Sequence, residues 1–333
     1  MKVKLIFILI CVFIFTAVVV SLVVLKPKKP TLPAQVTPPK PVEIPKVIND
    51  KYDVSFDLGE PFDIPTSAPL LTTNQQNPYT LEEANTIAQR LGFMLSPIEF
   101  KDVKKGMTYI WKRELYSLIV YSKTREIAYK MESGIPKVPN KQLKQNDMEL
   151  LTREVVEKTG LYSKDALQLS SVAYLKDTQR FEVKSLNGKE NADIYQFNYT
   201  PNTVSSYKIL TIVPYNSPIS VWILPNGEIF QLNLHELTGL SQTPETVPLK
   251  SFDEVQMNAN KAIIVSLDND NIEFVTLPNG AITNIKINEI ELFYLLDKTL
   301  GSTLQPVFLL RGKTNITGYG EVDVVLYLPA VKE

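Results

Sequence analysis

The sequence predicts an α+β fold, in which a single N-terminal transmembrane helix and a proline-rich linker precede an ectodomain of capped helices packed on antiparallel β-meanders. Three observations predict it: an uncharged apolar run near the start, a dense group of prolines directly after it, and capping motifs followed by alternating apolar and polar residues beyond residue 79. The regions that we expect are a cytoplasmic tail (1–4), the transmembrane helix (5–25), the linker (26–78) and two α+β lobes (79–245 and 246–333).

The apolar run extends from Leu5 to Leu25 and contains no charged residue. At about 1.5 Å per residue, a helix of this length spans roughly 31 Å, which matches a hydrocarbon core of about 30 Å. Lys2 and Lys4 favour a cytoplasmic N-terminus. We therefore expect a single-pass protein of the cell membrane that contacts the lipid bilayer through Leu5–Leu25 and has an extracytoplasmic C-terminal domain. A cleaved signal peptide is the alternative, but its apolar core would be only about 7 to 15 residues long.

The single cysteine of the chain indicates its compartment. Cys11 lies within the apolar run, and no cysteine follows anywhere after Leu25. Extracellular domains of eukaryotes usually form disulfides, so this distribution favours a bacterial or archaeal surface.

Proline dominates the segment after the apolar run. Seven prolines lie between Pro27 and Pro45, and each fixes φ and removes a backbone donor, which favours extended polyproline II structure. The acidic stretch from Asp50 to Asp63 is typical of a solvated tether, with cation binding as the alternative. Together these segments predict a spacer between the bilayer and the ectodomain.

Three capping signals predict helices in the ectodomain. Thr80 and Glu83 form a capping box, and Gly92 is suited to end the helix that follows. The apolar face of this helix consists of Leu81, Ala84, Ile87, Ala88 and Leu91. A second helix begins near Asn146. Its apolar stripe consists of Met148, Leu151 and Val155, and Gly160 ends it. Ser251–Glu254 has the spacing of another capping box, which predicts a third, shorter helix.

Between the predicted helices, apolar residues recur at every second position. The alternating segments are Met107–Trp111, Tyr116–Val120, Tyr195–Tyr199 and Phe230–Leu234. Such alternation indicates antiparallel sheets with one buried face. The sequence Leu-Pro-Asn-Gly occurs at Leu224–Gly227 and again at Leu277–Gly280, and Asn-Gly between apolar runs predicts a hairpin turn.

The composition excludes several classes of site. The chain has 35 Lys and Arg against 36 Asp and Glu, whereas a nucleic-acid binder would show a basic surface. One cysteine and one histidine exclude a cysteine-ligated zinc site and a histidine-rich metal centre. We predict no metal site, no cofactor, no nucleic-acid partner and no catalytic residue.

Three short motifs match the boxes of penicillin-binding enzymes: Ser205–Lys208, Ser185–Asn187 and Lys158–Gly160. They occur in the reverse of the order found in that family, and Gly160 is explained as a helix cap. We therefore interpret them as structural.

Three other features resemble functional motifs. Gly312–Thr314 imitates the end of a phosphate-binding loop, but the earlier glycine and the following helix are missing. Asp268–Asn271 begins like a calcium loop and lacks its glycine and closing glutamate. His235 is a candidate pH sensor or general base, but no nucleophile motif accompanies it, so we interpret it as a strand-end residue.

The C-terminal part of the chain resembles a known family. The segments that carry the resemblance are Tyr294–Leu296, Leu304–Leu309, Gly312 and Val325–Val331. They are similar to the closing meander of PepSY-like domains. The layout of the whole chain resembles the membrane-anchored YycH/YycI-type regulators of bacterial two-component systems. This resemblance implies a non-catalytic extracytoplasmic domain that binds protein partners or modulates a sensor or a protease, and it brings no catalytic residues.

The sequence therefore predicts a non-enzymatic binding or regulatory protein of the cell envelope, with a protein partner at the membrane. One alternative is an extracytoplasmic hydrolase of cell-wall or surface glycan, which would need two carboxylates about 5 to 9.5 Å apart in a cleft. The other is a structural or adhesin domain, which would expose an apolar patch.

Overall fold

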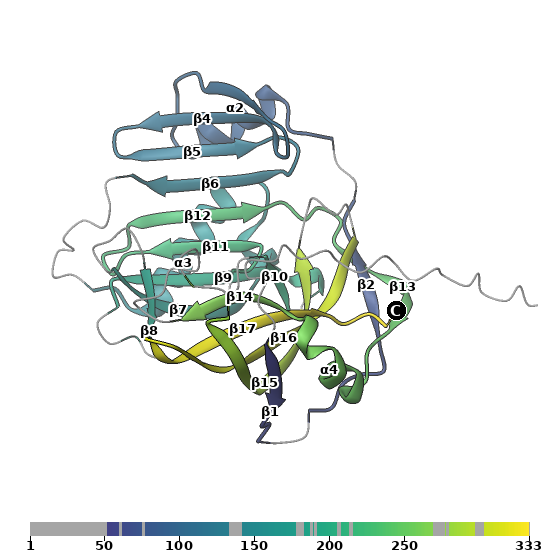
Figure 1. Ribbon diagram of the computed structural model, residues 1–333. Helices are drawn as coiled ribbons and strands as arrows, with labels where there is room; N and C mark the ends of the chain where they lie inside the picture. The colour runs from purple at the N-terminus through teal and green to yellow at the C-terminus, as the bar shows by residue number, and fades with distance from the viewer. Residues whose placement is uncertain are drawn as a thin grey trace, which may run out of the picture. The chain divides into compact units, whose positions relative to one another are not determined.

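Two large β-sheets make up most of the fold (Figure 1). The computed structural model describes residues 52–59, 62–74, 77–132, 142–177, 183–186, 189, 192–204, 208–212, 216–268, 277, 280–296 and 303–332. Of these residues, 53% lie in strands and 17% in helices.

The first sheet has nine strands, and every neighbouring pair in it is antiparallel. In order across the sheet the strands are β3 (Ile98–Asp102), β4 (Gly106–Arg113), β5 (Tyr116–Tyr121), β6 (Glu126–Met131), β12 (Ile229–His235), β11 (Ile219–Ile223), β9 (Ile194–Pro201), β7 (Leu167–Asp177) and β8 (Val183–Leu186). The pairing of β6 with β12 joins the β3–β6 meander to a strand that comes about a hundred residues later.

The second sheet has eight strands and is mixed. Its main path is β1 (Asp53–Phe56), β15 (Ile282–Leu296), β16 (Thr303–Ile316), β17 (Gly320–Pro329) and β14 (Ile263–Asp268). The three remaining strands are β10 (Ile209–Thr211), which pairs with β15, β2 (Ser67–Thr72), which pairs with β16, and β13 (Ser241–Pro248), which pairs with β2. β1 and β10 run parallel to β15, and the other pairs are antiparallel.

The helices are α2 (Leu81–Arg90), α3 (Gln145–Lys158) and α4 (Phe252–Asn258), with short 3₁₀ turns η1 (Lys164–Ala166), η2 (Asn202–Val204) and η3 (Ala259–Lys261). The predicted capping boxes are confirmed. The Thr80 side chain accepts from Glu83 N in front of α2, and Ser251 does the same with Glu254 N in front of α4. Gly92 has φ 87° directly after α2, as its position predicted.

The helix α3 differs from the prediction in its cap and its buried stripe. It starts at Gln145, next to the predicted Asn146, but its N-cap residue is Lys144, which makes no side-chain hydrogen bond to the helix. Its buried residues are Met148, Thr152 and Val156, which lie four residues apart.

One face of the nine-stranded sheet packs against α2 and α3. Buried side chains of both helices, among them Ile87 and Met148, share one apolar cluster with alternate strand residues such as Trp111, Leu118 and Phe197. This confirms the predicted alternation in β4, β5 and β9. Each fully buried side chain of this size contributes roughly 1.5–3 kcal/mol to folding.

The opposite face of this sheet carries a buried polar layer that reaches the second sheet. The Gln196 amide donates to Asn216 Oδ1 at 2.9 Å, and Asn216 O accepts from Thr211 N at 2.8 Å. Thr211 O in turn accepts from the hydroxyl of Tyr327, in β17, at 3.4 Å. Hydrogen bonds therefore connect the two sheets through the segment that contains β10.

The predicted fold class, α+β with capped helices on repeated meanders, is wrong, because the described fold is mostly β and assembles into two large sheets rather than helix-plus-meander units. The capping boxes are strong local signals, and for this reason the prediction overestimated the share of helix in the fold. The pairings that build the sheets join distant segments, such as β1 with β15 and β6 with β12, and these leave no local pattern in the sequence.

The predicted cytoplasmic tail, the transmembrane helix Leu5–Leu25 and the proline-rich segment up to residue 51 lie outside the described residues. Among the residues that are described, no helix is long and apolar enough to cross a bilayer. Two strands, β1 and β2, lie within the span predicted as linker, where β1 continues the second sheet beside β15. The division into lobes at residue 245 stays a prediction.

The predicted turn at Leu224–Gly227 is confirmed. It joins β11 to β12, and Gly227 N donates to Leu224 O at 2.9 Å. The second Leu-Pro-Asn-Gly sequence is only partly described, because Pro278 and Asn279 lie outside the described residues.

Candidate functional site

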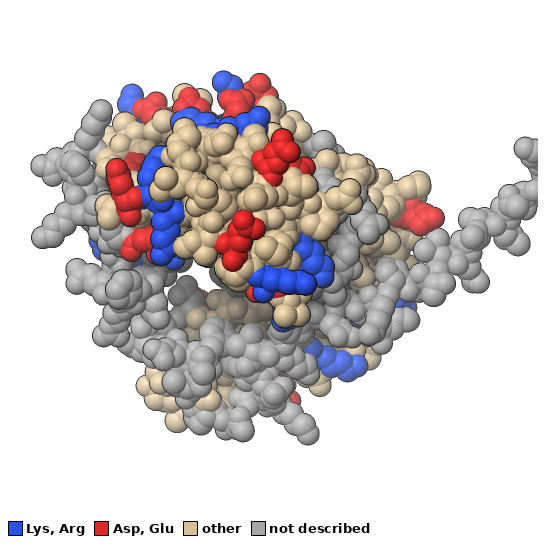
Figure 2. Space-filling view, turned by 90° about the horizontal axis from the view of Figure 1, so that it is seen from above, with Lys and Arg blue, Asp and Glu red and all other residues tan. Residues whose placement is uncertain are grey.

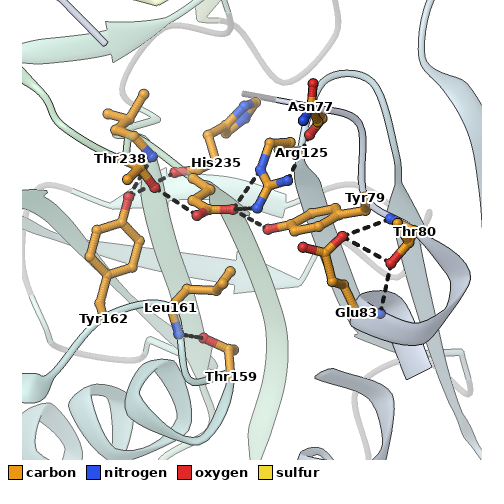
Figure 3. Close-up of polar contacts among 12 residues, drawn as sticks. Asn77, Tyr79, Thr80, Glu83, Arg125, Thr159, Leu161, Tyr162, His235 and Thr238 are labelled. Atoms are coloured by element: carbon orange, nitrogen blue, oxygen red, sulfur yellow. Dashed lines mark hydrogen bonds and ion pairs between the residues drawn. The ribbon is translucent and has the colours of Figure 1, made fainter. Parts of the chain in front are cut away.

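A cluster of polar side chains joins two segments that carry the chain between the sheets (Figure 3). One segment leads from β2 toward α2, and the other leads from β12 to β13. Their backbones meet where Asn74 N donates to Thr238 O at 3.0 Å. We name Tyr79, Arg125, Tyr162, Glu236 and Thr238 the junction cluster.

Glu236 lies at the centre of the junction cluster. Arg125 approaches one of its carboxylate oxygens with Nη2 at 2.7 Å and Nε at 2.8 Å, and the Tyr79 hydroxyl donates to the same oxygen. Thr238 Oγ1 donates to the other oxygen at 2.7 Å. Charge-assisted hydrogen bonds of this kind are about twice as strong as neutral ones, so the carboxylate is held firmly in its ionised form.

Arg125 connects three parts of the chain. It lies in the turn between β5 and β6, its Nη1 donates to Asn77 O at 2.8 Å, and its guanidinium lies 3.7 Å from the centre of the Tyr79 ring. Its backbone has φ 52°, which is unfavourable for a residue with a side chain. The contacts of the guanidinium offset this strain and fix the turn against the two crossing segments.

The acid–base properties of the cluster follow from burial and from these contacts. Burial by itself would raise the pKa of Glu236, but hydrogen bonds from Thr238 and Tyr79, together with the Arg125 charge, outweigh it and lower the pKa below its usual value of 4.5. Burial, and then the hydrogen bond to Glu236, raises the pKa of the Tyr79 phenol. The carboxylate is therefore ionised and the phenol neutral at neutral pH.

Tyr162 attaches the loop after α3 to the same place. Its hydroxyl accepts from Leu237 N at 2.7 Å and donates to His235 O at 3.3 Å, so that it contacts the backbone on both sides of Glu236. Burial raises the pKa of the Tyr162 phenol. The contacts of Arg125, Tyr162 and Glu236 hold several segments of the chain together, which is the arrangement of a structural clamp.

His235, the single histidine, lies at the end of β12, as predicted. Its Nδ1 is 3.7 Å from Glu126 Oε1, and Lys105 Nζ is 2.9 Å from the other oxygen of that carboxylate. Lys105 also lies 3.8 Å from the centre of the Tyr121 ring. The Tyr162 hydroxyl donates to the backbone carbonyl of His235.

The three motifs shared with penicillin-binding enzymes are not brought together as a site by the described residues. Lys158–Gly160 forms the C-terminus of α3, where Gly160 has φ 78°, and Ser185 lies in β8. Ser205, Ser206 and Tyr207 lie outside the described residues, while Lys208 is ion-paired with Glu291 at 2.8 Å.

The remaining two motifs have structural explanations where they are described. Gly312–Thr314 lies inside the long strand β16, not in a loop. A Cβ atom at Gly312 would lie 2.2 Å from Lys286 O, so the close approach of β15 requires glycine there. Asp268 ends β14, and residues 269–271 lie outside the described residues.

A cleft of about 390 Å³ lies where the C-termini of α2 and α3 meet the nine-stranded sheet. Its charged residues are Arg90, Arg113, Lys158 and Glu228. Arg90 Nη1 donates to Thr159 O at 3.3 Å, and Arg113 Nη1 donates to Gly92 O at 3.0 Å. The two arginines therefore satisfy carbonyls at the helix ends, where positive charge is favourable.

The same cleft contains one carboxylate, Glu228, which accepts from the Tyr116 hydroxyl. A second pocket, of about 460 Å³, lies beside α4 and is lined by two carboxylates, Asp63 and Glu254. Glu254 accepts from Lys332 Nζ and Ser251 N, each at 2.8 Å, and these hydrogen bonds lower its pKa to about 2. A glycosidase acid needs a raised pKa, so Glu254 is unsuited to that role.

Reasoning from the sequence missed the junction cluster. Its members lie far apart in the chain, at residues 79, 125, 162, 236 and 238, and no spacing rule relates them. Among the described residues that could bind a metal, no group of three or more His, Cys, Asp or Glu side chains is assembled.

The comparisons with known proteins add little. No protein-family model matches the chain, and no curated protein matches it either. Among solved structures, an uncharacterized protein from Eubacterium rectale aligns with 84% of this chain and 88% of its own length, at 14% identity and a TM-score of 0.44.

Proposed function

We propose that this chain is a membrane-anchored, extracytoplasmic binding protein of the cell envelope, which acts through an apolar surface at one end of its nine-stranded sheet. The grounds for the anchor are the length of the Leu5–Leu25 run and its lack of charge. The grounds for a regulatory role in the envelope are the resemblance of the C-terminal segments to PepSY-like domains and the layout shared with YycH/YycI-type regulators.

The observation that carries the binding function is the concentration of exposed apolar side chains around β3. Eleven large apolar side chains are exposed among the described residues, and five of them lie within ten residues of sequence. These five, which we name the α2–β3 surface, are Met94 (78% exposed), Leu95 (75%), Ile98 (62%), Phe100 (46%) and Val103 (95%). Single exposed apolar residues are normal, whereas five of them in one short segment favour an interaction site there.

Figure 2 views the molecule from the end where α2 and β4 lie in Figure 1. Uncharged surface occupies much of this face, and Lys and Arg side chains alternate with Asp and Glu side chains around it. Exposed apolar side chains next to charged ones are the usual composition of a protein–protein interface. A protein partner therefore fits this surface better than a polyanion does.

Affinity purification of the full chain from membranes tests the binding function. The variant carries Met94→Gln, Leu95→Gln and Val103→Gln. A control carries the same type of substitution at Leu115, Leu150 and Met257, which lie elsewhere and are 50–69% exposed. We expect the first variant alone to lose proteins that co-purify with the wild-type chain. If the wild-type chain and both variants co-purify with identical sets of proteins, the proposal is overturned.

Fractionation tests the anchor separately. The full chain should stay with the membrane pellet after an alkaline wash, and replacement of Phe13 and Val19 by lysine should release it. Recovery of the wild-type chain in the supernatant would refute the anchor.

A further inference from the structure

The edge strand β3 identifies a partner for the α2–β3 surface. Among the described strands β3 pairs with β4 alone, so its other edge presents backbone donors and acceptors outward. An exposed edge of this kind binds another strand by extending the sheet. We infer that the partner is a second copy of this chain, which pairs through β3 in an antiparallel arrangement centred on Phe100; this inference rests on the proposed binding function.

The local structure limits the pairing to five residues. Pro97 precedes the strand and has no N–H to donate. At the other end, the Asp102 carboxylate accepts from Lys104 N and Lys105 N, each at 2.7 Å, and turns the chain into β4. The free edge therefore consists of Ile98–Asp102.

Backbone geometry restricts the register further. Alternate residues of a strand present their backbone N–H and C=O groups to the same edge. In an antiparallel pair of strands, the backbone groups of two opposite residues either both point toward the partner strand or both point away from it. When two copies of the same strand pair, the numbers of two opposite residues must therefore differ by zero or by an even number. Three registers satisfy this condition near the centre of β3, and they place Glu99, Phe100 or Lys101 opposite its own copy.

Charge selects one of the three registers. The first places two Glu99 carboxylates opposite each other, and the third does the same with two Lys101 ammonium groups. The register centred on Phe100 instead places Glu99 of each copy opposite Lys101 of the other. Opposite charges stabilise a cross-strand pair and like charges destabilise it, so the sequence of the edge is complementary to itself in this register alone.

The side chains on the two faces agree with this arrangement. Glu99 and Lys101 point to the face that carries the helices, since they pair with Tyr109 and Met107 of β4. Ile98 and Phe100 lie on the other face, where Ile98 is the neighbour of Ile110. Pairing would place the two Phe100 rings side by side at the symmetry axis and cover the most exposed apolar positions of the strand.

Charge reversal tests the pairing in the full chain, solubilised in detergent and measured by analytical ultracentrifugation. Glu99→Lys alone, or Lys101→Glu alone, should weaken the dimer about tenfold, because each creates two like-charge pairs. The double variant Glu99→Lys/Lys101→Glu should restore wild-type affinity. Failure of the double variant to recover the dimer would overturn the register.

Cross-linking tests the symmetry axis directly. In a Cys11→Ser background, Phe100→Cys should form an intermolecular disulfide, because opposite Cα atoms lie about 4.5–5.5 Å apart, within disulfide range. Glu99→Cys should not cross-link to itself, since its copy lies about 7–8 Å away on the diagonal. A mixture of Glu99→Cys and Lys101→Cys chains should cross-link with each other.

The outcomes separate this inference from the proposed function. A wild-type chain that stays monomeric at all concentrations, or a Phe100→Cys variant that does not cross-link, overturns the self-pairing. If the co-purifying proteins still depend on Met94, Leu95 and Val103 in that case, the binding function stands and its partner is a different protein. Circular dichroism of each variant confirms that the exposed substitutions leave the fold intact.

Discussion

The Arg125 guanidinium lies 2.7 Å from the Glu236 carboxylate and joins the β5–β6 turn to the segment that leaves β12. The side chains of both residues are mostly buried, with 14% and 10% exposure. A pair in this setting is costly to break, because the partner that is left retains a buried charge.

Glu236→Gln should destabilise the protein by about 2–3 kcal/mol, because the amide keeps the shape of the carboxylate and loses its charge-assisted hydrogen bonds. Urea denaturation measures this difference. Glu321→Gln is the control, since its ion pair with Lys313 is exposed, and it should leave stability unchanged. Equal stability of the Glu236→Gln and wild-type chains would show that the pair contributes nothing to the fold.

The same substitution should change the dependence of stability on pH. The pKa of Glu236 is lowered in the folded chain from its usual 4.5, so the unfolded chain binds the proton more readily. The advantage of the wild-type chain over Glu236→Gln is therefore complete above about pH 4.5, and it declines as the pH falls through the lower, folded pKa. Denaturation curves at a series of acidic pH values test this. An advantage that does not change with pH would contradict the assigned contacts.

Alkaline titration should be coupled to unfolding. Burial raises the pKa of Tyr52, Tyr129 and Tyr199 from 10.0 to about 12, and it also raises those of Tyr79 and Tyr162. Because the folded-state values are raised, stability is complete below about pH 10 and falls as the pH rises toward the folded values. Absorbance of the phenolate should therefore increase together with the loss of circular dichroism. Smooth titration of all tyrosines near pH 10 in the folded chain would refute this.

Gly312→Ala should destabilise the protein by about 3 kcal/mol, because the new Cβ would collide with the backbone of β15 at Lys286, which no rotamer change can relieve. Thermal unfolding measures the loss. Gly59→Ala is the control, since a Cβ there would meet nothing within 4 Å, and it should be neutral or slightly stabilising. Equal melting temperatures for the two variants would contradict the close approach of the strands.

Lys250→Met should release the C-terminal segment. Lys250 is only 7% exposed, and its Nζ donates to Pro329 O at 2.9 Å and to Val331 O at 2.6 Å. Methionine fills similar space but leaves both carbonyls without this donor, at a cost of about 2–3 kcal/mol. Hydrogen exchange should accelerate at Lys332 N, which donates to Pro248 O. Exchange at the wild-type rate would show that the lysine does not hold this end of the chain.

The sequence allowed correct prediction of features that depend on neighbouring residues. Thr80 with Glu83 and Ser251 with Glu254 form the expected caps, and the turn at Leu224–Gly227 joins two strands as expected, because each depends on a few consecutive residues. The dominance of β structure was not predicted, since it results from pairings between distant strands. Nothing in the sequence around Arg125 or Glu236 indicates that they meet.

The glycine in Gly312–Thr314 shows how a motif can mislead. In the sequence it imitates a phosphate-binding loop, whereas in the fold it makes room for the backbone of a neighbouring strand. The exposed edge of β3 could not be recognised in advance either, because a strand is an edge only with respect to the complete sheet.

The pairing of β6 with β12 has a consequence for how the protein is made. Strands β3–β6 are synthesised before the strand that joins them to the rest of their sheet, because β12 ends only at residue 235. The second sheet closes later still, since β1 pairs with the late strand β15. The edge of β6 that pairs with β12 therefore has no partner within its sheet until the last third of the chain is available, which makes this edge a point of exposure to aggregation during folding.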